Sequence, residues 1–230
     1  ALSPKVSARL YTVSELKSGF SGFSLKSSSG ELVSLFKTND PETELKTWIL
    51  NASLESEPFH ALILLGFGLG YEALRLLDRL PKNSILAIVE PDPFQFFTAL
   101  HQVDFSVLLG NERVHFYVGQ TLEKTVESIG SELHWGRFVN LPFRILATGF
   151  MRRSRPDFLR QFNAQWRDAL QREMMYRRSR VEHGEAVVMN TIANAEAVLA
   201  CPGVSSLFYH FDGLPAVLAA AGPSLEKTIP

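Results

Sequence analysis

Three glycines at alternate positions lie between an apolar run and a predicted helix. They are Gly66, Gly68 and Gly70, in the segment ILLGFGLGYEALRLL. Glycine permits positive φ angles and the close approach of a ligand or a helix. The first turn of a helix also presents free N–H groups and a partial positive charge. The turn could therefore hold a phosphate or a ribose, or it could serve only to pack a strand closely against its helix.

An acid follows at the position where a nucleotide-binding sheet uses one. Glu90 ends the second apolar run, SILAIVE, 20 residues after Gly70. In dinucleotide-binding folds a carboxylate at this place accepts hydrogen bonds from ribose hydroxyls. No residue near the turn supplies a reactive group. We therefore favour tight packing as the role of the turn, and a vestigial, non-catalytic nucleotide site is the second interpretation.

The segment VNLPF, Val139–Phe143, is a second candidate, expected at the end of a fourth strand and on the same sheet edge as the glycine turn. It resembles the Asn-Pro-Pro-Phe/Tyr loop of S-adenosylmethionine-dependent amino-group methyltransferases, in which the Asn and the following carbonyl bind the amine. Asn140 would then be the binding residue. Two departures weaken the match. Leu141 stands in place of the first proline, and Leu64 stands where these enzymes carry an acid, two residues before the first glycine.

Basic charge is concentrated between residues 151 and 180. This segment contains nine arginines and three acids, a net charge of +6, whereas the whole chain has a formal net charge of −1. Such a helix could bind phosphates or an acidic partner. Phe158, Phe162 and Trp166 follow one another at four-residue spacing, which indicates a buried helix face and not a stacking surface for nucleic acid. We therefore expect a solvated basic face on a helix that links domains.

Composition excludes several classes of protein. The near-neutral net charge argues against nucleic acid as a partner. The only cysteine, Cys201, cannot form a disulfide within the chain, which favours a reducing, cytoplasmic location. The six histidines lack the spacing of metal ligands. Since no apolar run reaches the roughly 20 residues that span a bilayer, we also expect no membrane partner.

Strand-like and helix-like segments alternate between about residues 61 and 141. Apolar runs predict strands at 61–65, 84–90, 113–118 and 136–142, and helical spacing predicts helices at 70–80, 92–103 and 121–133. Alternation with short links is typical of an α/β fold, a Rossmann-like, mostly parallel sheet with flanking helices.

The whole chain is predicted to divide into four parts. A hairpin around Ser28–Gly30 and a helix from Pro41, capped by Asp40, come first. Beyond the sheet, two helices separated at Gly184 precede a new apolar strand, so we expect the native protein to continue past Pro230. The parts are a small hairpin-and-helix unit (1–57), the Rossmann-like domain (58–150), a helical linker (151–212) and the first strand and loop of a truncated central domain (213–230).

The order of motifs resembles that of the motility accessory factor family of flagellin glycosyltransferases. The motifs are NDPETELKTWI, LILLGFGLGYEALRLL, ILAIVEPDPFQFF, LPFRIL, the long basic helix and LPAVLAAAGPSLEK. The resemblance covers essentially the whole chain as that family's N-terminal part. The final AAGPSLEK is its most specific piece, and it also resembles the start of archaeal 6-hydroxymethylpterin diphosphokinase-like domains.

The resemblance implies an enzyme that transfers a nonulosonic acid, such as pseudaminic or legionaminic acid, from its CMP-activated form to Ser/Thr hydroxyls of flagellin. Gly222, Pro223 and Ser224 would begin the nucleotide-binding loop of the central domain, and the present part alone would be inactive. Its own role could be to recognise flagellin, to support a homo-oligomer or to keep a vestigial nucleotide turn. The alternatives are an S-adenosylmethionine-dependent methyltransferase and a pterin diphosphokinase.

Overall fold

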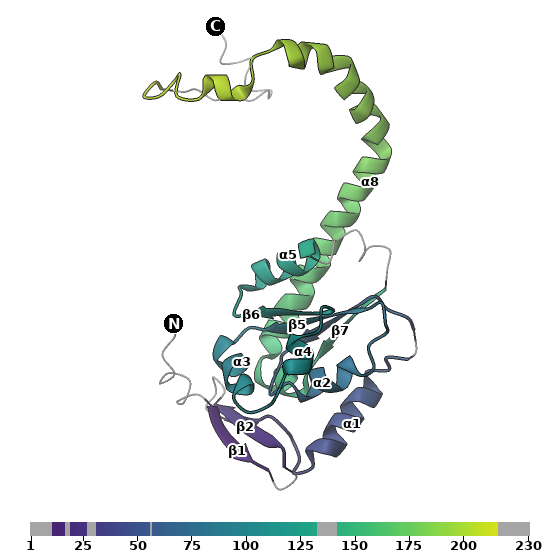
Figure 1. Cartoon of the computed structure of the whole chain (residues 1–230), viewed down its shortest axis with the longest axis vertical. Helices are drawn as coiled ribbons and strands as arrows, with labels where there is room; N and C mark the ends of the chain where they lie inside the picture. The colour runs from purple at the N-terminus through teal and green to yellow at the C-terminus, as the bar shows by residue number, and fades with distance from the viewer. Residues whose placement is uncertain (1–10, 17–18, 27–30, 56, 133–141, 216–230) are drawn as a thin grey trace. The chain divides into compact units, whose positions relative to one another are not determined.

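The computed structural model describes residues 11–16, 19–26, 31–55, 57–132 and 142–215 (Figure 1). The chain forms two compact units, Ala1–Arg177 and Arg178–Pro230, and the boundary between them lies inside one long helix. The predicted hairpin-and-helix unit and the predicted Rossmann-like domain therefore lie together in the first unit.

A four-stranded sheet forms the centre of the first unit. Its strands, in the order β6-β5-β4-β7, are all parallel to their neighbours. Every residue of the central strand β4 is buried, as expected of an all-apolar run covered on both faces. The predicted α/β, Rossmann-like class is thereby confirmed. The strands are β4 (Ala61–Leu65), β5 (Ile85–Glu90), β6 (Val114–Val118) and β7 (Phe143–Ala147).

The fourth strand differs from its prediction. Instead of 136–142, β7 spans Phe143–Ala147, and residues 133–141 lie outside the described part of the chain. The Pro142 carbonyl accepts a hydrogen bond from the His60 N–H, just before β4 begins. Pro142 and Phe143 therefore lie at the amino edge of the sheet, opposite the glycine turn, and their predicted placement on the same edge is wrong. The sequence pattern did not predict β7, because Arg144 interrupts its apolar run.

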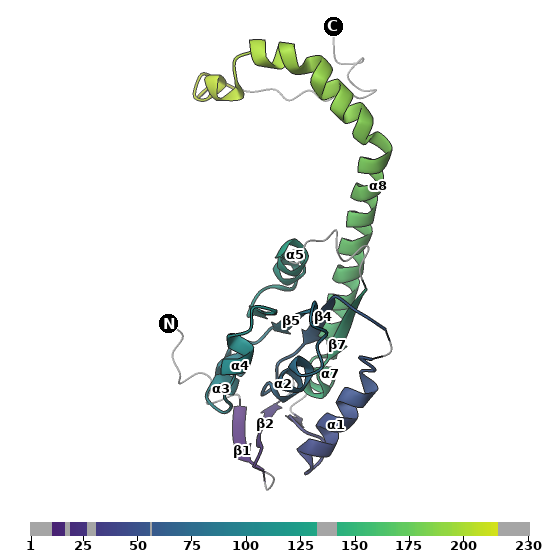
Figure 2. The same cartoon turned by 45° about the vertical axis from the view of Figure 1, so that its right-hand side comes forward.

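Helices cover both faces of the sheet (Figures 1 and 2). Leu62 and Leu64 of β4 belong to one buried cluster, which includes side chains from α1 to α4. Ile63 and Leu65 belong to a second cluster with α5 and the first part of α8. The alternation follows from the two-residue period of a strand. The helices are α1 (Pro41–Asn51), α2 (Tyr71–Leu77), α3 (Pro93–Leu100), α4 (Ser106–Leu109), α5 (Leu122–Glu132), α7 (Gly149–Ser154) and α8 (Pro156–Ala200).

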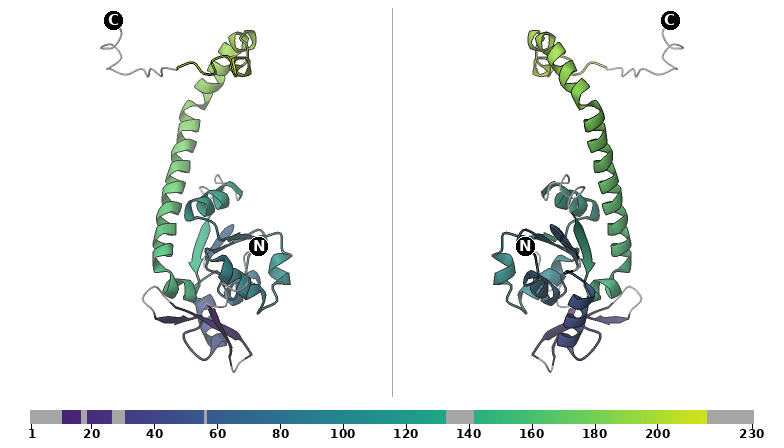
Figure 3. Two further views of the ribbon diagram at one scale, coloured as in Figure 1. Left: turned by 90° about the vertical axis from the view of Figure 1, so that its left-hand side faces the viewer. Right: turned by 90° about the vertical axis from the view of Figure 1, so that its right-hand side faces the viewer.

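A small antiparallel sheet precedes α1 (Figure 3). Its buried side chains belong to the first buried cluster. The predicted hairpin is confirmed as β2 (Ser21–Lys26) paired with β3 (Leu32–Ser34), and β1 (Tyr11–Glu15) adds a strand that was not predicted. The Phe23 ring packs edge-on against Phe150 at 4.8 Å between centroids. The small sheet is therefore attached to the larger one through shared apolar side chains.

The helix α8 is continuous where two helices were predicted. Gly184 lies inside it, and the predicted break there is wrong, because a helical glycine costs only about 1 kcal/mol relative to alanine. Phe162 and Trp166 are buried as predicted and stack with their ring centroids 6.0 Å apart. Within the described ranges, no helix combines the length and apolar character needed to cross a membrane.

Candidate functional site

The glycine turn joins the carboxyl end of β4 to α2. Gly66, Gly68 and Gly70 have φ angles of +88°, +60° and +75°, all in the left-handed region that only glycine adopts readily. Gly70 is the residue before α2, and no side chain caps this helix. The sequence predicted this turn correctly, and the alternating glycines follow from its backbone conformation.

Protein side chains occupy the space against each glycine. A Cβ atom on Gly66 would lie 2.7 Å from the Met151 Cβ and 2.8 Å from the Thr148 Oγ1. A Cβ on Gly68 would lie 3.0 Å from the Leu35 Cδ1. The glycines are thus needed to let neighbouring side chains approach, which favours the packing interpretation.

Replacing Gly70 by alanine tests this packing directly. The new Cβ would lie 2.4 Å from the Phe105 Cε1 and 2.6 Å from the Phe67 Cζ, and the φ angle is unfavourable as well. We expect the free energy of unfolding to fall by about 3 kcal/mol, measured by urea denaturation.

Gly19→Ala is the matched control. Gly19 has nearly the same φ, +76°, but a Cβ atom added there would meet no atom within 4 Å among the described residues beyond its own chain neighbours. It should lose only about 1 kcal/mol, the cost of the backbone conformation alone. Equal losses in the two variants would contradict the packing interpretation.

The Glu90 carboxylate is bound by the protein itself. Glu90 is fully buried at the end of β5. Its Oε2 accepts hydrogen bonds from the Phe67 N–H at 2.8 Å and from the Gln95 Nε2 at 2.8 Å, and its Oε1 accepts one from the Asp92 N–H at 3.0 Å. The acid expected to contact ribose therefore ties the glycine turn to the start of α3. Burial raises its pKa to about 7, against the lowering effect of the two backbone N–H groups.

The switch point of the sheet lies between β4 and β7, because the chain moves from β4 to β5 and β6 on one side and returns to β7 on the other. In open α/β sheets ligands bind outside the carboxyl ends of the strands at such a point. Here the buried side chains of Leu35, Phe67 and Phe150 come together in one core cluster next to these strand ends. The segment after β3 thus helps to close the crevice that a nucleotide would enter.

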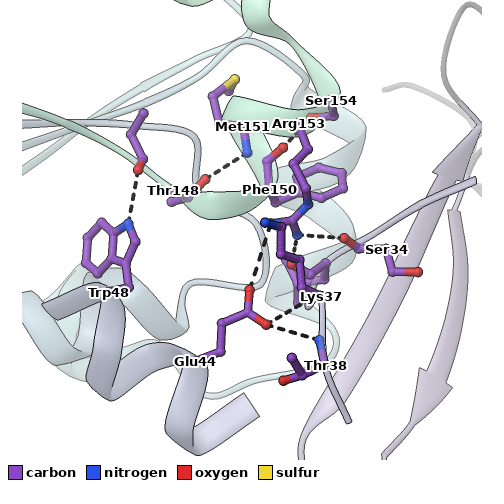
Figure 4. Close-up of polar contacts among 12 residues, drawn as sticks. Ser34, Lys37, Thr38, Glu44, Trp48, Thr148, Phe150, Met151, Arg153 and Ser154 are labelled. Atoms are coloured by element: carbon purple, nitrogen blue, oxygen red, sulfur yellow. Dashed lines mark hydrogen bonds and ion pairs between the residues drawn. The ribbon is translucent and has the colours of Figure 1, made fainter. Parts of the chain in front are cut away.

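A polar cluster fastens that segment to α1 and α7 (Figure 4). The Arg153 Nη2 donates to the carbonyls of Ser34 at 2.9 Å and Leu35 at 2.7 Å. The Glu44 Oε2 accepts from the backbone N–H groups of Lys37 at 2.8 Å and Thr38 at 3.3 Å. An ion pair of 3.8 Å joins the Arg153 and Glu44 side chains. These contacts hold residues 34–38 across the carboxyl edge of the sheet.

Glu72 adds a buried carboxyl group to this cluster. It is 6% exposed, and in the described part of the chain its Oε2 has no hydrogen-bond partner. Desolvation is the main cause that raises its pKa to about 7, and the negative charge of Glu44 adds to the effect. The Gly149 N–H and Arg153 lower the pKa, but they do not offset burial.

A pocket of about 430 Å³ lies between α1 and α7, beside this cluster. We call it the edge pocket. The Trp48 side chain lines it, and the Trp48 Nε1 donates to the Ala147 carbonyl, the last of β7, at 3.1 Å. The remaining lining residues are Lys37, Thr38, Thr43, Glu44, Thr47, Asn51, Gly149, Arg152 and Arg153. The edge pocket is thus open space next to the switch point, whereas the glycine turn is filled.

The sequence alone does not predict the edge pocket. Its pattern places Trp48 on the buried face of a helix and indicates for Glu44 only a favourable acid in the first helical turn. A signal does exist for α7, because Thr148 is a typical N-cap and accepts a hydrogen bond from the Met151 N–H at 3.1 Å. The contacts of Arg153 with residues 34 and 35 join positions far apart in sequence and leave no local pattern.

The remaining predicted site residues cannot be placed, and the predicted basic helix does not form a single site in the described structure. Asn140, Gly222, Pro223 and Ser224 lie outside the described residues. The arginine-rich segment is divided among separate contacts: Arg155 pairs with Asp92 at 2.7 Å, and Arg172 lines a groove where acids predominate. The described ranges hold no cluster of His, Cys, Asp and Glu that could bind a metal ion.

No model of a protein family matches the chain, and no curated protein sequence matches it. A function for the chain therefore has to be inferred from its own residues.

Proposed function

We propose that this chain is a non-catalytic accessory part of a flagellin glycosyltransferase, one that transfers a nonulosonic acid from a CMP-sugar to Ser/Thr hydroxyls. The catalytic assignment rests on the motifs that resemble the motility accessory factor family. The role of this part is structural or protein-recognising, and it contributes no reactive group.

The observation that carries the non-catalytic role is the occupancy of the glycine turn. Glu90 accepts the Phe67 N–H, and side chains fill the space against Gly66 and Gly68. The N–H groups of Gly66 and Gly70 also have backbone acceptors. A phosphate would need these N–H groups and that space. A sheet of this class can keep its glycine turn for packing after ligand binding is lost.

The second compact unit supports a role in protein contacts. All of its described residues except Gly184 are exposed. Large apolar side chains are among them, with Val181 and Leu199 86% exposed and Tyr209 90% exposed. Many exposed large apolar side chains in one unit favour contact with other protein.

A sugar-transfer assay tests the catalytic assignment. It uses the complete gene product, CMP-activated nonulosonic acid as donor and flagellin as acceptor, with mass spectrometry of flagellin as the readout. We expect addition of the sugar to Ser/Thr residues. Absence of transfer with both pseudaminic and legionaminic acid donors would count against the assignment.

Calorimetry on the present chain tests the non-catalytic role. We expect no measurable binding of S-adenosylmethionine or CMP at the glycine turn, because the N–H groups of Gly66, Phe67 and Gly70 already have acceptors and side chains fill the space against the turn. Micromolar binding of S-adenosylmethionine that Gly68→Val abolishes would instead indicate a methyltransferase. A folded state of that variant, checked by circular dichroism, is required for the comparison.

A further inference from the structure

We propose that the edge pocket binds a small anionic sugar. Its position is the first argument. The Trp48–Ala147 hydrogen bond places it beside the carboxyl end of β7, at the switch point where doubly wound sheets hold their ligands. Side chains fill the space against the glycine turn, and the open space lies farther out, between α1 and α7.

Trp48 provides a fixed aromatic wall. Its Nε1 is bound to the Ala147 carbonyl, so the orientation of the indole ring is set before any ligand arrives. The side chain packs partly against the buried core and partly lines the edge pocket. A rigid aromatic face is suited to the apolar face of a sugar ring, at little cost in conformational entropy.

A row of polar side chains lies next to that wall. Thr43, Thr47 and Asn51 follow one another at four-residue spacing on α1, so they share one face of the helix, and all three are exposed. The Thr47 hydroxyl donates to the Thr43 carbonyl and keeps its capacity to accept. Hydroxyl and amide groups can both donate and accept, which matches the hydroxyls of a sugar.

Two cations supply the charge preference. Lys37 and Arg152 line the edge pocket. Neither the Lys37 ammonium group nor the Arg152 guanidinium group forms a hydrogen bond or an ion pair with another described residue. The other two charged residues, Glu44 and Arg153, form an ion pair with each other and hydrogen bonds with backbone groups. The uncommitted charge is thus positive, and it favours a carboxylate or a phosphate on the ligand.

The size of the edge pocket fits one anionic monosaccharide. Its volume of about 430 Å³ lies near the lower end of small-molecule sites. The preference for an anion follows from the pocket alone. The choice of a sugar as the ring that carries the anion rests in part on the proposed function, which supplies acidic sugars as the group transferred.

Nuclear magnetic resonance of the ¹⁵N-labelled chain tests the proposal. The indole N–H of Trp48 and the backbone N–H groups of Thr47 and Gly149 report on the pocket. The probes are glucuronate, N-acetylneuraminate, glucose 6-phosphate, glucose and CMP. We expect saturable shifts at these positions with the anionic sugars, and binding of glucose at least about tenfold weaker because it lacks the charge. Glucuronate and glucose 6-phosphate together show whether carboxylate or phosphate is preferred.

Variants assign the binding to the pocket. Arg152→Ala should weaken binding of the preferred anionic sugar about tenfold. The matched control is Lys46→Ala, on the same helix α1, since Lys46 is 69% exposed, pairs with Glu42 and lies outside the pocket. Its affinity should equal that of the wild type.

Three results would overturn the proposal: no anionic sugar shifts these resonances, glucose binds as well as glucuronate, or CMP binds and the sugars do not. The transfer assay is independent of this titration. Failure of sugar transfer with intact binding refutes the proposed function alone, and transfer without binding here refutes the pocket alone.

Discussion

Replacing Glu90 by alanine is expected to lower the free energy of unfolding by about 3 kcal/mol. The change leaves three donors without their acceptor: the buried Phe67 N–H and Gln95 amide, and the half-buried Asp92 N–H. Each unsatisfied buried group costs about 1–3 kcal/mol, and the relief of a desolvated carboxylate offsets part of the sum. The temperature of thermal unfolding should fall by about 10 °C for a unit of this size.

The comparison needs a conservative variant and a surface control. Glu90→Gln keeps one acceptor oxygen and the shape of the side chain, so its loss should be intermediate. Glu112→Ala removes an exposed acid on a loop and should change stability by less than about 0.5 kcal/mol. If Glu90→Ala were as stable as Glu112→Ala, the hydrogen bonds of Glu90 would not be what connects the glycine turn to α3. That result would favour a role of Glu90 in binding a ligand.

Replacing Glu72 by glutamine is expected to stabilise the protein at pH 8 by about 3 kcal/mol and to leave it nearly unchanged below pH 4.5. Burial raises the pKa of Glu72 to about 7 from an ordinary value of 4.5. Between these two values the folded state binds more protons than the unfolded state. Stability is therefore greatest below the unfolded pKa and is lost as the pH rises through the folded pKa, and a neutral glutamine removes that loss.

Urea denaturation at several pH values between 4.5 and 8 measures the effect. The wild type should lose stability over this window through both Glu72 and Glu90, whose pKa is also raised to about 7. Glu72→Gln should remove only one of the two contributions, and Glu112→Gln should remove neither. A pH dependence in Glu72→Gln as steep as that of the wild type would show that Glu72 is not the group that titrates.

Local sequence patterns predicted the parts of this protein whose neighbours in space are also neighbours in the chain. The run ALILL predicted β4 because an all-apolar strand has to be covered on both faces, and Asp40 with Pro41 predicted the start of α1. Phe162 and Trp166 predicted the buried face of α8 by their spacing. Strand β7 and the unbroken helix through Gly184 were missed, because tertiary contacts satisfy Arg144 and a single glycine costs a long helix little.

The role of the candidate site was decided by long-range contacts. The sequence determined by itself that Gly66, Gly68 and Gly70 form a turn at the end of a parallel strand, since that conformation depends on the backbone of those residues. Only the tertiary structure decided that Leu35 and Thr148, from segments far along the chain, take the space against this turn, and that Arg153 and Trp48 leave the edge pocket beside it. Whether a turn is empty or filled depends on side chains that pack onto it from elsewhere, and local periodicity carries no record of them.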